Sequence, residues 1–172
     1  MDFGDKSKFA VTIELDKNYN GAWLFGRICY WVAGIMVGYY DLGTSLRDVL
    51  FEMMYIPGDN GKRYCLPLFN LGKEKIFSLI SGVLDETSDE IYSYIHEDFM
   101  PARFDVGIRV DVFDDWRMFL IDGDKISKFI YKKHGSTSIV ENFLPVGEFD
   151  QVFNQAYTYL DNLYEEQISK NK

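Results

Sequence analysis

The stretch WLFGRICYWVAGIMVGYY, residues 23–40, decides the fold. Its first part, residues 23–32, is apolar on both faces apart from one arginine, which is typical of a central strand covered on both sides. Ala33-Gly34 predicts a tight turn into a second strand over residues 35–40. Upstream, large apolar side chains alternate with small or polar ones from Lys8 to Leu15, which predicts a strand with one buried face. The first forty residues are therefore expected to form a three-stranded antiparallel meander.

Helical patterns follow this meander and return at the end of the chain. The first predicted helix begins where Ser45 and Asp48 fit a capping box, and it ends before Pro57. Apolar spacing predicts a second helix from about Lys73 to Leu84. A further helix is expected from Glu148 to about Gln167, with apolar side chains along one face.

Between these helices lies a second group of predicted strands. The stretch PARFDVGIRVDVF, residues 101–113, shows the cleanest alternation in the chain. Residues 116–121 and 125–132 flank Asp122-Gly123, which is a strong hairpin signal. The whole order predicts an α+β fold with a mostly antiparallel sheet and helices packed on a face, in the order βββ-α-α-(α)-βββ-α. We expect one domain spanning residues 1–172.

Composition and charge narrow the classes of function. The chain has 172 residues, of which 47% are hydrophobic, and its net charge is −9. Such a chain repels a phosphate backbone, so we expect no direct binding of nucleic acid and an attraction to basic proteins. Cys29 and Cys65 have no metal-ligand spacing, and no signal peptide or membrane-spanning run is visible. A cytoplasmic protein without a membrane segment is expected.

Catalytic motifs are not visible in the sequence. His96 and His134 are the only histidines, and neither lies in a zinc-protease pattern. Asp111, Asp114 and Asp115 form a dense carboxylate group, which leaves a metal-dependent hydrolase as one alternative. Their spacing lacks the alternating ligands of a calcium loop, so the end of a polar strand is the preferred interpretation. We expect no enzyme, no metal site and no cofactor.

The stretch DETSDEIYSYIHED, residues 85–98, gathers six carboxylates and contains no Lys or Arg. Thr87 and Glu90 fit a capping box, which predicts a helix with apolar side chains facing inward at four-residue intervals. No lysine at i+4 neutralises these acids, although such pairs are common on solvated helices. We therefore predict part of a partner-binding surface here, although a solvated helix face remains the alternative. Its residues are Asp85, Glu86, Asp89, Glu90, Tyr92, Tyr94, Glu97 and Asp98.

Three longer stretches together resemble a known family. The resemblance is carried by FGDKSKFAVTIELD (3–16), GAWLFGRICYWVAGIMVGYYDLGTSLRDVL (21–50) and PARFDVGIRVDVFDDWRMFLID (101–122). In these stretches the chain resembles the Immunity protein 42 family of bacterial polymorphic-toxin systems, which include contact-dependent growth inhibition loci. The resemblance also implies a set of fold determinants: Trp23, Gly26, Arg27, Gly43, Ser45, Leu46 and Arg47.

The resemblance implies a function that residue chemistry alone does not reach. Such proteins are not enzymes. They reside in the cytoplasm and bind the toxin domain that is encoded beside them. By blocking the active site or substrate surface of the toxin, they protect the producing cell and its siblings. Many of these toxins are nucleases with a basic cleft, which an acidic inhibitor complements. The alternative is an acidic regulatory or adaptor module that binds another basic protein or a small ligand.

Overall fold

The computed structural model describes residues 1–19, 21–96 and 98–170, and the chain folds into two compact units. Unit 1 comprises residues 1–58, 108–115 and 148–172, and unit 2 comprises residues 59–107 and 116–147. Each unit is thus assembled from separate segments of the chain. The single domain expected over the whole chain stays a prediction.

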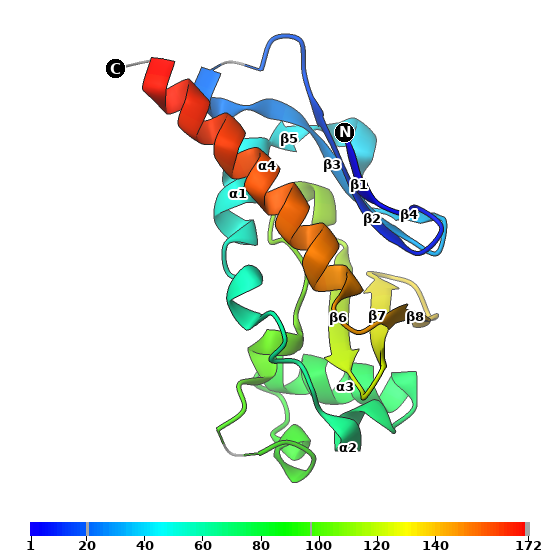
Figure 1. Ribbon diagram of the computed structural model, residues 1–172. Helices are drawn as coiled ribbons and strands as arrows, with labels where there is room; N and C mark the ends of the chain where they lie inside the picture. Colours follow the sequence, from blue (N-terminus) through cyan, green and yellow to red (C-terminus); the bar gives the residue numbers. More distant parts are fainter. Residues whose placement is uncertain (20, 97, 171–172) are drawn as a thin grey trace. The chain divides into compact units, whose positions relative to one another are not determined.

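Unit 1 contains an antiparallel sheet in the order β1-β2-β3-β4, with the short β5 also paired to β3 (Figure 1). Its strands are β1 (Asp2–Gly4), β2 (Phe9–Leu15), β3 (Phe25–Val32), β4 (Ile35–Val37) and β5 (Thr44–Ser45). Strand β3 pairs with β2, β4 and β5, so the predicted central position is confirmed. The meander of β2, β3 and β4 is also confirmed, whereas β1 is an addition that the sequence pattern did not predict.

Strands β3 and β4 form a hairpin with a tight two-residue turn. Ala33 and Gly34 both have positive φ angles, 50° and 80°. Two such residues in succession match the right-handed twist of a two-residue hairpin, and glycine tolerates this conformation best. Val32 then pairs with Ile35 directly across the turn.

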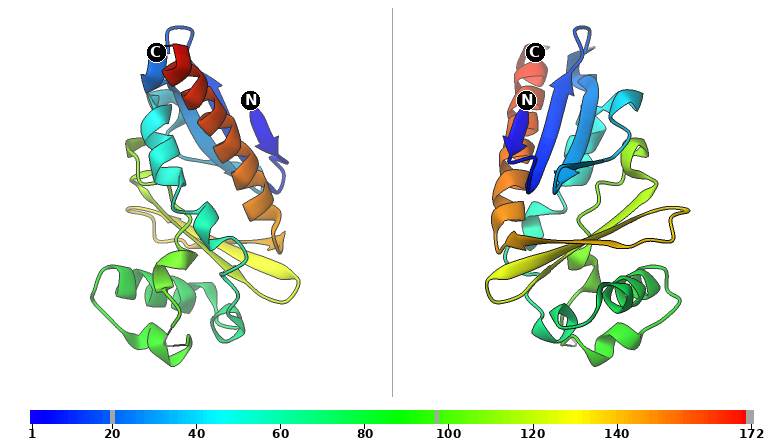
Figure 2. Two further views of the ribbon diagram at one scale, coloured as in Figure 1. Left: turned by 60° about the vertical axis from the view of Figure 1, so that its left-hand side comes forward. Right: turned by 90° about the vertical axis from the view of Figure 1, so that its right-hand side faces the viewer.

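Two helices of unit 1, α1 (Leu46–Met53) and α4 (Glu148–Lys170), pack against this sheet (Figures 1 and 2). Ser45 caps α1, and its hydroxyl accepts the backbone N–H of Asp48 as predicted. Phe149 of α4 lies 4.8 Å from Phe9 of β2, measured between ring centroids. The core of unit 1 is therefore rich in aromatic rings from the sheet and from α4.

Unit 2 contains a three-stranded antiparallel sheet in the order β6 (Trp116–Asp122), β7 (Ile126–Lys133) and β8 (Val140–Pro145). The hairpin predicted around Asp122-Gly123 is confirmed, with the Gly123 N–H donating to the Ile126 carbonyl. Strand β8 was not predicted, because only its Leu144 is fully buried and its pattern is weak.

The strand predicted within residues 101–113 is wrong, although its burial pattern is right. Phe104, Val106 and Ile108 are buried as the alternation requires. The backbone instead forms short 3-10 turns at Pro101–Phe104 and Asp111–Phe113. The Asp105 carboxylate accepts the Gly107 N–H, and such a local side-chain bond competes with pairing along a strand. The segment keeps a short pairing with β6, through the Asp105–Phe119 bridge and the Val106 N–H that donates to the Met118 carbonyl. Strand β8 pairs at the other edge of the sheet, with β7.

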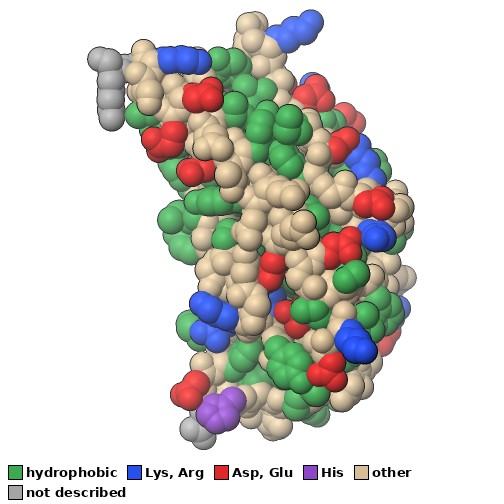
Figure 3. Space-filling model, in the orientation of Figure 1, with side chains coloured by type: hydrophobic (Ala, Val, Ile, Leu, Met, Phe, Trp, Pro, Cys, Tyr) green, Lys and Arg blue, Asp and Glu red, His purple; other side chains and the backbone are tan. Residues whose placement is uncertain are grey.

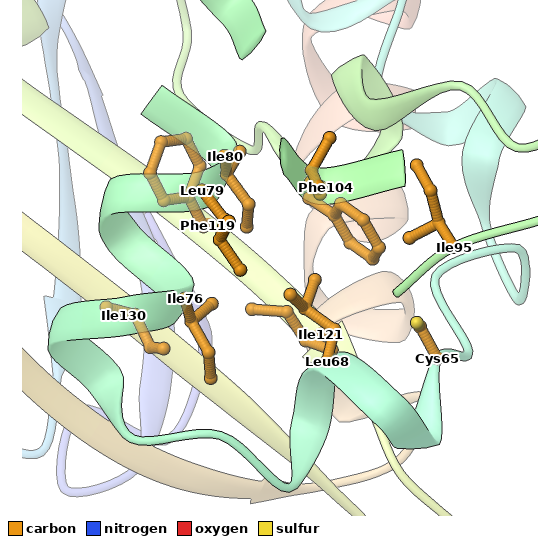
Figure 4. Close-up of a cluster of buried hydrophobic side chains, with 11 residues drawn as sticks. Cys65, Leu68, Ile76, Leu79, Ile80, Ile95, Phe104, Phe119, Ile121 and Ile130 are labelled. Carbon is orange, nitrogen blue, oxygen red and sulfur yellow. The ribbon is translucent and has the colours of Figure 1, made fainter. Parts of the chain in front are cut away.

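The helices of unit 2 bury a mainly aliphatic cluster, which also contains the rings of Phe104 and Phe119, against β6 and β7 (Figure 4). Helix α3 (Lys73–Leu84) has the predicted bounds, and the four-residue α2 (Leu66–Phe69) precedes it. Ile76 and Ile80 of α3 are fully buried in this cluster. The α+β class with antiparallel sheets and helices packed on them is confirmed for both units.

Candidate functional site

The acidic stretch, residues 85–98, does not form the predicted helix. Among its described residues, helical backbone is confined to a 3-10 turn at Glu90–Ser93, whose N-cap Asp89 makes no side-chain capping bond. The Thr87 hydroxyl, expected to begin a new helix, instead donates to the Gly82 carbonyl at the end of α3. Glu86 has a φ of 57°, the left-handed conformation that commonly ends a helix. The capping pattern therefore serves the C-terminus of α3 rather than the start of another helix.

The apolar side chains of this stretch do point inward, as their spacing predicted. Ile91 is fully buried and Ile95 is 8% exposed, and both join the core of unit 2, where Figure 4 shows Ile95. Tyr94 and Phe99 are partly buried and pack against the same cluster. Tyr94 is thus a core-contacting ring, whereas Tyr92 is half exposed.

Two acids of the stretch are paired with cations that lie elsewhere in the sequence. Arg117 of β6 makes two hydrogen bonds to the Asp85 carboxylate, of 2.6 and 2.8 Å, and these lower the pKa of Asp85. The Lys75 ammonium of α3 lies 2.5 Å from a Glu90 oxygen, and this contact raises the pKa of Lys75. The absence of a lysine at i+4 therefore does not leave Asp85 and Glu90 unneutralised, because cations from other segments pair with them.

The remaining acids of the stretch stay open to solvent. Glu86, Asp89 and Asp98 are exposed, and Asp98 approaches the His96 ring at 3.5 Å. Within the described part of the chain, Glu86 and Asp89 have no ion-pair partner. Glu97 lies outside the described residues. The partner-binding role of this stretch stays a prediction.

A second acidic region lies on unit 1, at a hollow that we call the aromatic cleft. Its volume is about 630 Å³, within the range of sites that hold a small ligand or a side chain. It is formed where the ends of β2 and β3, the start of α1 and the segment after Ile108 come together. The lining residues are Asp16, Phe25, Gly26, Leu42, Gly43, Thr44, Ser45, Asp48, Val110 and Asp111.

Aromatic rings build one border of this cleft. Phe25 lines it, and the Trp23 ring stacks on Phe25 with an interplanar angle of 6° and centroids 6.3 Å apart. The Arg47 guanidinium lies 3.7 Å from the Trp23 ring centroid and donates two hydrogen bonds to Asp48. The family resemblance pointed to Trp23 and Arg47 as fold determinants, and their cation–π contact lies at the cleft border, while that role stays a prediction.

The carboxylates of the cleft come from three separate segments. The Asp16 N–H donates to the Phe25 carbonyl, which places this residue beside the aromatic border. Asp111 accepts hydrogen bonds from the Thr44 hydroxyl and the Val112 N–H, both at 2.9 Å. Sequence reasoning missed this site because its acids are far apart in the chain. The turn glycine Gly43 and the cap Ser45 were the available signals.

The described residues also bear on a metal site, a hydrolytic centre, a disulfide and a membrane-spanning helix. No group of three or more His, Cys, Asp or Glu side chains among them could hold a metal ion. Two of the three carboxylates of the hydrolase alternative make hydrogen bonds within the fold: Asp115 accepts the Tyr39 hydroxyl, and Asp111 accepts the Thr44 hydroxyl. Both cysteines are buried free thiols. Among the described residues, every helix is too short or too polar to pass through a bilayer.

Comparison with known proteins places these features in a family. The structure is similar to the crystal structure of CdiI from Burkholderia dolosa AUO158, with a TM-score of 0.72 and 18% sequence identity, over 92% of this chain and 99% of that chain. At that identity the likeness is one of fold alone. No curated protein matches the chain. The model of the family described as Immunity protein 42 matches residues 1–159. The chain belongs to the Immunity protein 42 family, whose members are inhibitors rather than enzymes.

Proposed function

We propose that this protein binds a cognate toxin domain and neutralises it by covering the toxin's active site or substrate surface. The observation that carries the proposal is the family match over residues 1–159. The fold that the chain shares with CdiI from Burkholderia dolosa AUO158 agrees with the family match. Such inhibition requires an exposed binding surface on this protein, and it does not require a catalytic group.

The partner is expected to be a basic toxin domain, such as a nuclease, that acts in the cytoplasm of the cell. A nuclease presents positive charge to its substrate, and this chain carries a net charge of −9. Complementary charge raises the rate of encounter and the selectivity for the partner. In this proposal the inhibitor and the toxin share one compartment, and fast association lets the inhibitor bind the toxin before the toxin reaches its substrate.

The exposed part of the acidic stretch is the proposed encounter surface of unit 2. Glu86 and Asp89 contribute charge that is not cancelled by an ion pair within the described residues. Tyr92 is 50% exposed and offers the kind of aromatic contact that often carries binding energy. Tyr94 is not a proposed contact, because its side chain packs against the core of unit 2.

The test uses this chain and the C-terminal domain of the large secreted protein encoded beside it. Tight association and loss of toxin activity are expected, whereas no complex at micromolar concentration would reject toxin neutralisation. The double variant Glu86→Lys with Asp89→Lys should lower the association rate about tenfold at low salt. Glu165→Lys with Glu166→Lys, an equal change of charge on α4, is the matched control. Equal association rates for the two variants would mean that the acidic stretch is only a solvated surface and does not contact the toxin.

A further inference from the structure

The border of the aromatic cleft leaves several large apolar side chains in solvent. Trp23 is 46% exposed, Phe25 40% and Leu42 64%. Single exposed apolar residues are common, but neighbouring ones at the rim of a hollow are typical of binding surfaces. Trp and other aromatic residues are also enriched where proteins meet. The cleft is thus suited to an occupant that covers these rings.

The charge of the cleft decides which occupant fits. Asp16 and Asp111 line it without an ion-pair partner in the described part of the chain, while Asp48 is paired with Arg47. Covering a carboxylate with an apolar or negative group costs free energy, because the charge loses water without gaining a partner. An occupant must therefore bring positive charge.

The spread of the carboxylates favours an organic cation over a metal ion. No three acidic, histidine or cysteine side chains among the described residues come close enough to hold a metal. A guanidinium on its alkyl stem can instead lie against an aromatic ring and still reach carboxylates beside it. The site already contains one such arrangement, since Arg47 stacks on Trp23 and donates to Asp48 at 2.8 Å.

We propose that the aromatic cleft of unit 1 receives an arginine side chain of the toxin domain. The stem of that arginine lies along the Phe25 ring, and its guanidinium meets Asp16 and Asp111. Arginine fits better than lysine, because its planar group both stacks on rings and donates to two acceptors. This inference rests on the proposed function, since it takes the toxin as the partner, and it assigns to that function a contact on unit 1.

The first experiment measures the Kd of the toxin domain for charge variants of the whole chain. Asp16→Asn should raise the Kd about tenfold, and Asp16→Lys should raise it further. Glu165→Lys, a charge reversal at an exposed position of α4, should leave it within about threefold. The thermal unfolding midpoint of each variant shows that it is folded. If Asp16→Lys binds as well as Glu165→Lys, the inference is overturned, whereas failure of the unchanged chain to bind rejects the proposed function itself.

The second experiment does not depend on the toxin. Arginine methyl ester is titrated against the whole chain, and the NMR resonances of Trp23 and Phe25 are followed. Saturable shifts are expected with arginine methyl ester, and much smaller ones with citrulline methyl ester, which lacks the guanidinium charge. Asp16→Asn should weaken the arginine response several-fold. Equal responses to the two esters would overturn the assignment of the cleft to a guanidinium group.

Discussion

The two units of this protein present negative charge in different ways. In unit 2 the acids are neighbours in sequence, and part of their charge is cancelled by Arg117 and Lys75. In unit 1 Asp16 and Asp111 are far apart in sequence, and folding brings them to one cleft beside exposed rings. A dense run of acids is thus a poor guide to the strongest local field, because cations from other segments can neutralise it.

The cores of the two units differ in a related way. Unit 1 packs rings against rings, as with Tyr30 and Phe113, whose centroids lie 5.0 Å apart. Unit 2 buries mainly aliphatic side chains such as Ile76 and Ile121. Each unit also holds one buried cysteine, Cys29 in unit 1 and Cys65 in unit 2. These thiols provide a natural reporter for comparing the two units.

The largest expected effect is protection of the two thiols from a thiol-specific reagent at about pH 8. Burial raises the pKa of Cys29 to about 11 and also raises that of Cys65. Both should react at least about 1,000-fold more slowly in the folded protein than in urea, because reaction requires opening. Cys65, which is 6% exposed against 1% for Cys29, should react first, as measured by mass spectrometry. Faster labelling of Cys29 than of Cys65 would contradict the expectation that the thiol of unit 1 is the better protected of the two.

The next largest effect is expected for Gly26→Ala, at a residue that lines the cleft. An added Cβ would lie 2.2 Å from the Glu14 carbonyl oxygen and 2.7 Å from Leu46. The backbone oxygen cannot give way cheaply, so the free energy of unfolding should fall by about 3 kcal/mol in urea denaturation. Gly58→Ala is the control, since nothing lies within 4 Å of the added atom there. Similar stabilities of the two variants would show that β2 and β3 are not packed this closely.

A smaller effect is expected for Arg47→Met, which keeps the apolar stem and removes the charge. The variant loses the stack on Trp23 and the hydrogen bonds to Asp48. The free energy of unfolding should fall by about 1 kcal/mol. Lys17→Met, at an exposed site of the same unit, should change it very little. If the two variants lose the same stability, the stack does not hold the cleft border.

The smallest effect is expected for Asp85→Asn in unit 2. The hydrogen bonds from Arg117 lower the pKa of Asp85, so the pair stabilises the folded state above about pH 4 and loses this effect as the pH falls through the lowered pKa. Both side chains are nearly half exposed and solvent screens them, so about 0.5 kcal/mol is expected at pH 7.

The measurement for this pair is urea denaturation at about pH 7 and about pH 3, with Asp89→Asn as the matched control. The difference between the two variants should shrink at the lower pH, where Asp85 begins to take up a proton. A difference that is absent at pH 7 would mean that Arg117 does not neutralise the acidic stretch in solution.

Much of the fold was predictable because it depends on local patterns. Helix α3 has the predicted bounds, since side chains at helical spacing share one face whatever surrounds them. The β3–β4 turn follows from Ala33-Gly34, and the β6–β7 hairpin from Asp122-Gly123. The alternation from Phe104 onward correctly predicted that Phe104, Val106, Ile108 and Val112 are buried, whereas Val110 on the same predicted face is only partly buried.

The tertiary structure decided what depends on contacts between distant segments. It added β8 beside β7, and it limited the pairing of the segment around Asp105 with β6 to a short bridge. It paired Asp85 with Arg117 and brought Asp16 to the same cleft as Asp111. Periodicity specifies which face of a segment is buried. Which charged group lies next to that segment depends on the tertiary path of the backbone, because ion pairs and hydrogen bonds form between groups that are close in space.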